Sequence, residues 1–255
     1  MPLQIITIPC LADNYAYLIR ETDTGQVAVV DVPEAGPILG ALNDLDWPLH
    51  QILITHHHYD HIGGLEELRT TTGAKVYGAT VDSHRLPKLD EALTEGDTFK
   101  LGNEVCDIMD VSGHTIGHIA FLFKNANAVF SADSLMALGC GRVFEGDFAM
   151  MWGTMLKFKA LPDDTLVYSG HEYTMSNAKF ALTIEPDNAD LKTRIADIED
   201  KRANNIPTVP ASIGMEKATN PFMRADLPKV KALVDMAEAN DAAVFGEIRI
   251  RKDRF

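Results

Sequence analysis

The sequence predicts an α+β fold in which a strand-rich first part is followed by a helical second part. Up to about residue 170, short apolar runs alternate with glycine-containing turns, which is typical of strands. After Tyr173, apolar residues recur at helical spacing and prolines punctuate the chain. We therefore expect a sheet-based domain over 1–172 and a helical domain over 173–255.

Nine apolar runs in the first part are predicted strands, because they are short, rich in Val, Ile and aromatic residues, and bounded by turns. In chain order they are LQIITI, YAYLI, VAVVDV, QILIT, AKVYGA, VCDIMDV, IAFLF, AVFSAD and TLVYSG. Helices are expected between some of them, at 36–45, 64–72 and 148–160. This mixture indicates helices packed on sheets.

Three helices are expected in the second part. They begin near Asn188, Pro228 and Asp241, residue types that favour helix starts and are followed here by apolar residues three and four apart. The first carries Leu191, Ile195 and Ile198 at spacings of four and three, and the second has Val230, Leu233, Val234 and Ala237 on one face. The third is expected to bury Val244, Phe245 and Ile248.

Bulk composition limits the possible partners. The chain has 255 residues, 46% of them hydrophobic, which is enough for a full core. Its formal net charge of −14 repels phosphate backbones, so nucleic acid is not expected as a partner. Apolar runs of 18 or more residues are absent from the sequence, so no membrane span is expected. The opening MPLQIITIPCLADNY has neither a basic segment nor a long apolar one, so no secretory signal is expected.

The three cysteines, Cys10, Cys106 and Cys140, are odd in number and widely spaced. This spacing favours neither a disulfide framework nor a CxxC metal site, and it suits a reducing compartment. We therefore expect a cytoplasmic protein. A monomer is a separate expectation.

The strongest chemical signal is the segment ILITHHHYDHIGG, in which four histidines and one aspartate follow an apolar strand. In an extended segment, residues two apart point to the same side, so His56 and His58 can converge on one ion while His57 faces away. Asp60 and His61 lie past the bend, where they can reach a second ion. Such clustering has few purely structural uses and predicts a metal site.

Three further predicted strands end in a side chain that can bind metal: His114, Asp133 and His171. Imidazole and carboxylate ligands suit zinc, iron or manganese. Seven candidate ligands are too many for one closed tetrahedral ion, so we expect two ions, about 3.5–4 Å apart as in other hydrolytic sites. Asp133 is the expected bridge, because a carboxylate offers two oxygens whereas an imidazole offers one donor nitrogen at a time.

The other candidates carry weaker signals. His118 lies four residues past His114 and is interpreted as structural, and His50 and His84 have no ligand context. Asp31, at the end of VAVVD, has two equally supported interpretations: a carboxylate that orients a ligand loop, or a turn residue at a strand end. The basic tail RIRKDRF is, on composition alone, a solvated helix end as readily as a binding site.

These motifs carry a family resemblance. THHHYDH has the T-H-x-H-x-D-H pattern of the metallo-β-lactamase superfamily, and nearly the whole chain resembles the glyoxalase II (hydroxyacylglutathione hydrolase) family. The likeness runs through ADNYAYLI, THHHYDHIGG, SGHTIGH, FSADSL, GCGRVFEGD, YSGHEYT, ATNPFMR and RIRKDRF. The first motif is specific only for the superfamily, whereas GCGRVFEGD, GHEYT and the tail are specific for the family.

The resemblance implies an αββα sandwich followed by a helical domain, with two divalent metal ions, zinc first and iron or manganese as alternatives. The implied ligands are His56, His58 and His114 for one ion, Asp60, His61 and His171 for the other, and Asp133 between them. Asp60 and Asp133 are the implied catalytic residues, as metal ligands that hold a bridging hydroxide.

The implied glutathione contacts are Arg142, Tyr173, Arg249 and Lys252, together with position 144. The family has a tyrosine at that position, whereas this chain has Phe144, so the hydroxyl's hydrogen bond must be lost or replaced. Arg249 and Lys252 would meet the carboxylates of glutathione, while the other two arginines of the tail are solvated.

The implied reaction is hydrolysis of S-(2-hydroxyacyl)glutathione, in particular S-D-lactoylglutathione, to glutathione and D-lactate, the final step of methylglyoxal detoxification. Water shared by two cations loses a proton near neutral pH, and a thiol of pKa about 8.5 can leave without a strong general acid. The alternatives are a single-iron persulfide dioxygenase of the same fold and a non-enzymatic module whose ions only stabilise the fold. Lactonase, lactamase and nuclease activities are less favoured.

Overall fold

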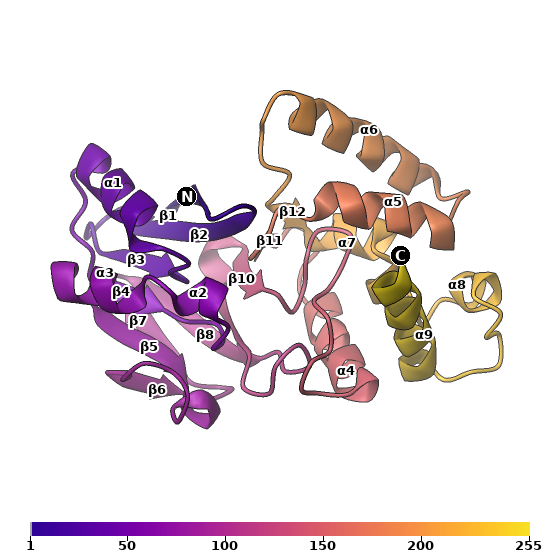
Figure 1. Cartoon of the computed structure of the whole chain (residues 1–255), viewed down its shortest axis with the longest axis horizontal. Helices are drawn as coiled ribbons and strands as arrows, with labels where there is room; N and C mark the ends of the chain where they lie inside the picture. Colours follow the sequence, from indigo (N-terminus) through magenta and orange to yellow (C-terminus); the bar gives the residue numbers. More distant parts are fainter. Residues whose placement is uncertain (1) are drawn as a thin grey trace. The chain divides into compact units, whose positions relative to one another are not determined.

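The computed structural model describes residues 2–255. The chain forms two compact units. Unit 1 comprises the chain up to Asp110 and the segment Ile116–Ser131, and unit 2 comprises Val111–Thr115 and Ala132–Phe255. These units are defined by contacts, and the domains 1–172 and 173–255 remain a prediction. Figure 1 gives the labels of the elements within each unit.

Unit 1 begins with a six-stranded sheet in the order β1-β2-β3-β4-β5-β6. The strands are β1 (Leu3–Cys10), β2 (Asn14–Glu21), β3 (Val27–Val30), β4 (Gln51–Leu53), β5 (Lys75–Ala79) and β6 (Glu91–Leu93). The first three pair antiparallel, and β3 to β6 pair parallel. All four residues of β3 are buried, which is why VAVV is a continuous apolar run.

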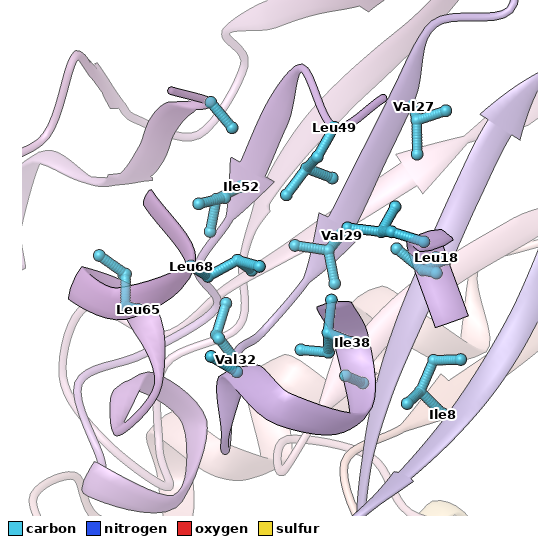
Figure 2. Close-up of a cluster of buried hydrophobic side chains, with 14 of the residues drawn as sticks. Ile8, Leu18, Val27, Val29, Val32, Ile38, Leu49, Ile52, Leu65 and Leu68 are labelled. Atoms are coloured by element: carbon cyan, nitrogen blue, oxygen red, sulfur yellow. The ribbon is translucent and has the colours of Figure 1, made fainter. Parts of the chain in front are cut away.

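One face of this sheet packs against the helices α1 (Ala35–Leu45) and α3 (Leu65–Thr72). Figure 2 shows the resulting core, in which Leu18 and Val29 of the sheet meet Ile38 of α1 and Leu68 of α3. Gly64, directly before α3, lies so close to α1 that a Cβ there would be 2.3 Å from the amide nitrogen of Ala35. A glycine is therefore required at the end of the segment ILITHHHYDHIGG, where α3 begins.

A second group of antiparallel strands in unit 1 faces the other side of this sheet. These strands are β7 (Thr98–Leu101), β8 (Glu104–Asp110), β9 (Ile119–Phe123) and β10 (Ala128–Ala132, whose last residue belongs to unit 2). Aromatic rings from the two layers are in contact. The ring centroids of Tyr17 and Phe130 lie 5.6 Å apart, and those of Tyr77 and Phe99 lie 5.0 Å apart. Unit 1 also contains α2 (Tyr59–Ile62) and the short 3-10 helices η1 (Thr80–Asp82) and η2 (Lys124–Ala126).

Unit 2 is mainly helical. It contains α4 (Phe148–Lys159), α5 (Thr174–Ile184), α6 (Ala189–Ala203), α7 (Ile213–Thr219), η3 (Pro221–Met223), α8 (Pro228–Leu233) and α9 (Asp241–Arg254). Its strand β11 (Leu166–Ser169) pairs antiparallel with the short β12 (Ala211–Ser212). The ring of Phe245 on α9 lies near those of Trp152 on α4 and Phe222 on η3, so these three elements share one core.

All nine predicted strands and the three helices predicted between them are confirmed. Asn188 caps α6 by accepting a hydrogen bond from the amide of Leu191, and α9 begins at Asp241 as predicted. The helix at Pro228 is shorter than predicted, since it ends at Leu233 and leaves Ala237 outside it. The strands β6, β7 and β12 and the helices α2, α5 and α7 were not predicted from the sequence. Among the described residues, no helix is both long and apolar enough to cross a membrane.

Candidate functional site

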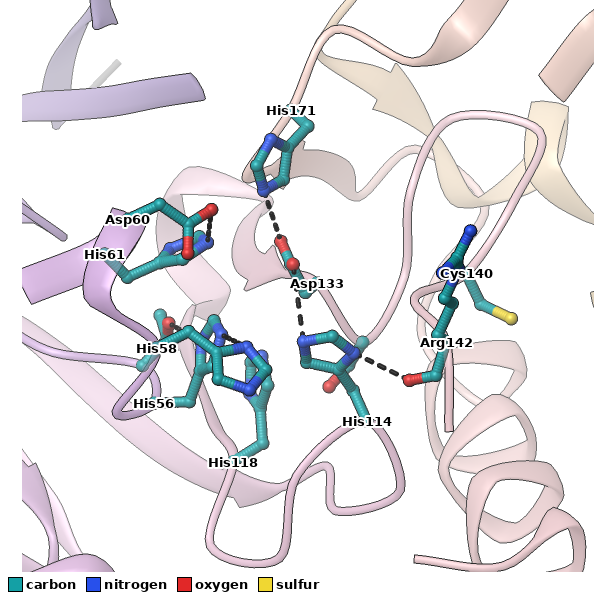
Figure 3. Close-up of polar contacts among 12 residues, drawn as sticks. His56, His58, Asp60, His61, His114, His118, Asp133, Cys140, Arg142 and His171 are labelled. Atoms are coloured by element: carbon teal, nitrogen blue, oxygen red, sulfur yellow. Dashed lines mark hydrogen bonds and ion pairs between the residues drawn. The ribbon is translucent and has the colours of Figure 1, made fainter. Parts of the chain in front are cut away.

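In unit 1, the predicted ligands follow the end of β4 and run into α2. His56 and His61 are fully buried, and His58 is the extended residue from which α2 starts. The Nε2 of His56 lies 3.1 Å from the Nδ1 of His58 (Figure 3), and the Nε2 of His61 lies 3.7 Å from the Oδ2 of Asp60. The structure thus brings these four predicted residues together in two adjacent pairs.

Asp31 holds this loop in place. Its carboxylate accepts hydrogen bonds from the amide of Thr55 at 2.9 Å, from the hydroxyl of Thr55 at 2.8 Å and from the Nδ1 of His61 at 2.7 Å. Because the Nδ1 of His61 carries the proton, its Nε2 presents a lone pair. Asp31 adopts a left-handed backbone with φ 57°, so it is both a turn residue and the carboxylate that orients the loop.

The same hydroxyl sets the tautomer of His56. The hydroxyl of Thr55 donates its proton to Asp31, so it can only accept from the Nδ1 of His56, 3.0 Å away. The Nε2 of His56 therefore presents its lone pair beside His58. Two imidazole nitrogens held at 3.1 Å suit a cation placed between them.

Asn14 supports Asp60 and was missed by the sequence analysis. It is buried at the start of β2, and its amide donates to the backbone carbonyl of Asp60 at 3.0 Å and to its Oδ2 at 3.1 Å. The side chain of Asp60 is therefore held in one orientation. The signal for this residue was its place in the family-like block ADNYAYLI, rather than any metal-binding pattern.

In unit 2, the other three predicted ligands form a chain of contacts shown in Figure 3. The Nε2 of His114 lies 3.4 Å from one oxygen of Asp133, and the Nε2 of His171 lies 3.4 Å from the other. All three residues are buried. One carboxylate between two imidazoles is the arrangement expected of a residue that bridges two ions.

The backbone of the following loop fixes His114. Its Nδ1 donates to the carbonyl of Arg142 at 2.7 Å, so its Nε2 turns a lone pair towards the carboxylate oxygen of Asp133. Two such acceptors facing each other suit a cation between them, which fits a divalent metal. Gly141 permits this approach, because a Cβ there would lie 2.5 Å from the carbonyl of Asp133 and 2.6 Å from the Nδ1 of His114.

The predicted cationic contacts gather around Asp253 in unit 2. Arg249 is only 4% exposed, and it donates to the carbonyl of Cys140 at 2.9 Å and to Asp253 at 3.1 Å. Arg142 is exposed, and its Nε lies 3.9 Å from the same carboxylate. Lys252 donates to the carbonyl of Ser176 at 3.2 Å. Partial burial, and then the nearby charge of Arg249, lower the pKa of Lys252 to about 8.

The two aromatic positions lie against predicted ligands. The ring of Tyr173 stacks on His171 with centroids 4.7 Å apart, and that of Phe144 lies 5.4 Å from His114. The side chains of both remain accessible, with Phe144 60% exposed. Phe144 therefore presents an apolar surface beside His114.

The remaining histidines have structural contacts. His118 is fully buried and stacks on His56, with centroids 4.5 Å apart. The Nδ1 of His50 accepts from the amide of Val27 at 3.1 Å, and His84 is exposed. His57 turns to Asp82, with its Nδ1 3.4 Å from the carboxylate. Strand alternation predicted that His57 faces away from His56 and His58. In the structure its ring lies next to Asp82.

Comparison with known families matches two profiles along the chain. "Metallo-beta-lactamase superfamily" matches residues 12–171, and "Hydroxyacylglutathione hydrolase C-terminus" matches residues 172–255. The first range contains all seven predicted metal ligands, and the second contains Tyr173, Arg249 and Lys252.

Relatives that match over the full length of the chain carry the same family name as the C-terminal profile. The chain is 57% identical over 255 residues to a hydroxyacylglutathione hydrolase of Ruegeria pomeroyi, with 100% of both chains covered. It is 59% identical over 252 residues to one of a Jannaschia species, covering 99% of this chain and 98% of that one.

Solved structures show the fold. The BLEG-1 B3 metallo-β-lactamase matches with a TM-score of 0.67 at 21% identity, covering 86% of this chain and 99% of that one. ETHE1 from Myxococcus xanthus matches with a TM-score of 0.64 at 25% identity, covering 96% of this chain and 100% of that one. The expected metallo-β-lactamase fold, with sheets flanked by helices and a helical C-terminal part, is confirmed.

Proposed function

Because the chain belongs to the hydroxyacylglutathione hydrolase family of the metallo-β-lactamase superfamily, we propose that it hydrolyses the thioester of S-(2-hydroxyacyl)glutathione. The preferred substrate in this proposal is S-D-lactoylglutathione, and the products are glutathione and D-lactate. The observation that carries it is identity above one half over the full length to relatives of that name. These relatives do not favour the alternative of a persulfide dioxygenase.

The proposed cofactor is a pair of divalent metal ions, with zinc as the first choice and iron or manganese as alternatives. The residues that would hold them are His56, His58 and His114, then Asp60, His61 and His171, with Asp133 shared. When bound, the pair would lower the pKa of a water molecule towards 7 and polarise the thioester carbonyl. The adjacent lone pairs within each unit support this assignment.

The chain's own residues prepare the donor atoms. Asp31 and the carbonyl of Arg142 each accept an Nδ1 proton, so the Nε2 of His61 and the Nε2 of His114 each present a lone pair. Asn14 donates to Asp60, which favours a fixed ligand over a mobile general base. The leaving thiolate has a pKa of about 8.5 as a free thiol, so a strong acid is not required.

The binding groups proposed for glutathione are Arg142, Lys252 and Tyr173, with Arg249 behind them. Lys252 and the exposed Arg142 would meet carboxylates directly. Arg249 is buried against Cys140 and Asp253, so it would hold the loop and the helix that present the other two cations. Binding energy from this remote part of the substrate would orient the thioester.

We also propose a cytoplasmic monomer. Cys10, Cys106 and Cys140 are all free and buried, which suits a reducing compartment.

The proposal is tested by hydrolysis of S-D-lactoylglutathione by protein of measured metal content. A matched thioester that carries the same acyl group on a simple thiol serves as the control substrate. We expect metal-dependent turnover of the glutathione thioester and a much lower kcat/KM for the control. Equal kcat/KM values would reject glutathione recognition, and oxygen consumption with glutathione persulfide would support the dioxygenase instead.

A further inference from the structure

A buried carboxylate outside the proposed ligand set, Asp82 of η1, connects segments of unit 1. Its side chain is 1% exposed. One oxygen accepts from the Nε of Arg85 at 2.9 Å, and the other lies 3.4 Å from the Nδ1 of His57. Arg85 also donates to the carbonyl of Ile116 at 2.7 Å. Asp82 thus links the metal motif to the segment that leads into β9.

His57 matters because of its place in the chain. It lies between His56 and His58, and in extended backbone a residue points opposite to both neighbours. Its ring stands at 87° to that of His56 and 61° to that of His58. Anchoring His57 on Asp82 therefore restrains the directions in which both neighbours can point.

The segment after Ile116 rests on the same carboxylate. Gly117 has φ +92°, and a Cβ there would lie 2.6 Å from the Oδ1 of Asp82. The next residue, His118, stacks on His56 at an interplanar angle of 14°, and the amide of Ile119 donates to the carbonyl of Thr55 at 3.0 Å. Asp82 therefore supports His56 from two sides: through His57 in the motif, and through the segment that places His118 on its ring.

We propose that His57, Asp82 and Arg85 form a positioning network that holds His56 and His58 in the orientation that binds metal. The network acts through the ligands and is not itself a set of ligands. It gives a role to the one histidine of THHHYDH that the proposed chemistry leaves unused. This inference rests on the proposed metal site, but its test does not require turnover.

The first test replaces Asp82 with Asn in the full chain. Asparagine keeps the shape but removes the carboxylate to which Arg85 donates and against which His57 lies. Zinc affinity of the metal-free protein is measured by competition with a chromophoric chelator. We expect a loss of about 10- to 100-fold, the usual effect of removing a group that orients metal ligands. At saturating zinc, kcat should fall while KM for the glutathione thioester stays unchanged.

A second variant, His57→Ala, leaves Asp82, Arg85 and Ile116 connected and removes only the anchor inside the motif. It keeps the proposal testable if Asp82→Asn does not fold, and it should also weaken zinc binding. His84→Ala, at an exposed histidine two residues from Asp82, is the matched control and should bind zinc like the unaltered chain.

Lower melting temperatures with unchanged zinc affinity in both variants would show a purely structural network and overturn the inference. Failure of the proposed function looks different: the unaltered chain would bind zinc, the variants would bind it more weakly, and no thioester would be hydrolysed.

Discussion

The two units present their candidate ligands in different ways. In unit 1, four donors come from six consecutive residues, His56 to His61, and a carboxylate side chain, Asp31, orients them. In unit 2, His114, Asp133 and His171 come from three separate segments, and a backbone carbonyl, that of Arg142, orients the first of them. The ligands of unit 1 are therefore close in sequence, and single substitutions around them should disturb their orientation. The orientation of His114 in unit 2 depends instead on the backbone path of the loop that contains Arg142.

The largest expected effect comes from the residue shared by both proposed ions. Replacing Asp133 with Ala removes the carboxylate that lies between His114 and His171. We expect loss of bound metal and a fall in kcat/KM of at least about a thousandfold, since two-metal catalysis contributes several kcal/mol. Metal content and hydrolysis rate are measured on the same sample. Retention of full metal content would contradict the bridging role.

A smaller loss is expected when the support of unit 1 is removed. Asp31→Ala leaves the predicted ligands in place but frees the Nδ1 of His61 and the hydroxyl of Thr55. Metal affinity should fall by about 10- to 100-fold. Chelator competition measures it, with Asp23→Ala, at an exposed turn residue, as control. Unchanged affinity would mean that the loop is held without Asp31.

Arg249 is one of the proposed glutathione-binding residues of unit 2. Because it joins α9 to the carbonyl of Cys140, Arg249→Ala should displace the neighbouring cations and raise KM by about tenfold, or 1.4 kcal/mol. The value of kcat should change little. Steady-state kinetics distinguish the two parameters, and a large fall in kcat at constant KM would refute a positioning role.

The lowered pKa of Lys252 leads us to expect that substrate binding depends on pH. Its pKa is lowered to about 8, so the free enzyme carries this positive charge below pH 8 and loses it above. An anionic substrate prefers the protonated form, so KM should rise as pH increases through 8. A KM profile from pH 6.5 to 9.5 measures this. Lys252→Arg, which keeps its charge throughout the range, should abolish the inflection. An inflection that persists in this variant would assign it to another group.

The smallest expected effect is at Phe144. Phe144→Tyr adds the hydroxyl that the family resemblance implies at this position, on a ring that is already exposed beside His114. One hydrogen bond of about 1 kcal/mol corresponds to a decrease in KM of about fivefold. KM is measured for the glutathione thioester and for the thioester that lacks glutathione. The second KM should not change. Equal changes for both substrates would indicate that the hydroxyl does not contact glutathione.

The contrast between the units also explains what the sequence could predict. Buried strands such as VAVV were predictable because their apolar runs are continuous, whereas TFKL of β7 was missed because most of it is exposed or half-buried. The motif at 56–61 was recognisable from local spacing. Assigning His114 and His171 to particular ions required the family resemblance, because their partners are distant in sequence.

Supporting contacts were harder to predict. Asn14 has no metal-binding pattern around it, and Asp31 was equally consistent with a simple turn. The carbonyl that orients His114 belongs to the backbone of Arg142, so the identity of that side chain carries no information about it.

The most direct test of the central claim is a zinc titration of the metal-free chain, followed by metal content per chain and by hydrolysis of S-D-lactoylglutathione. We expect saturation at two ions per chain, with full turnover only when both have bound. Saturation at one ion per chain, or full turnover without metal, would contradict it.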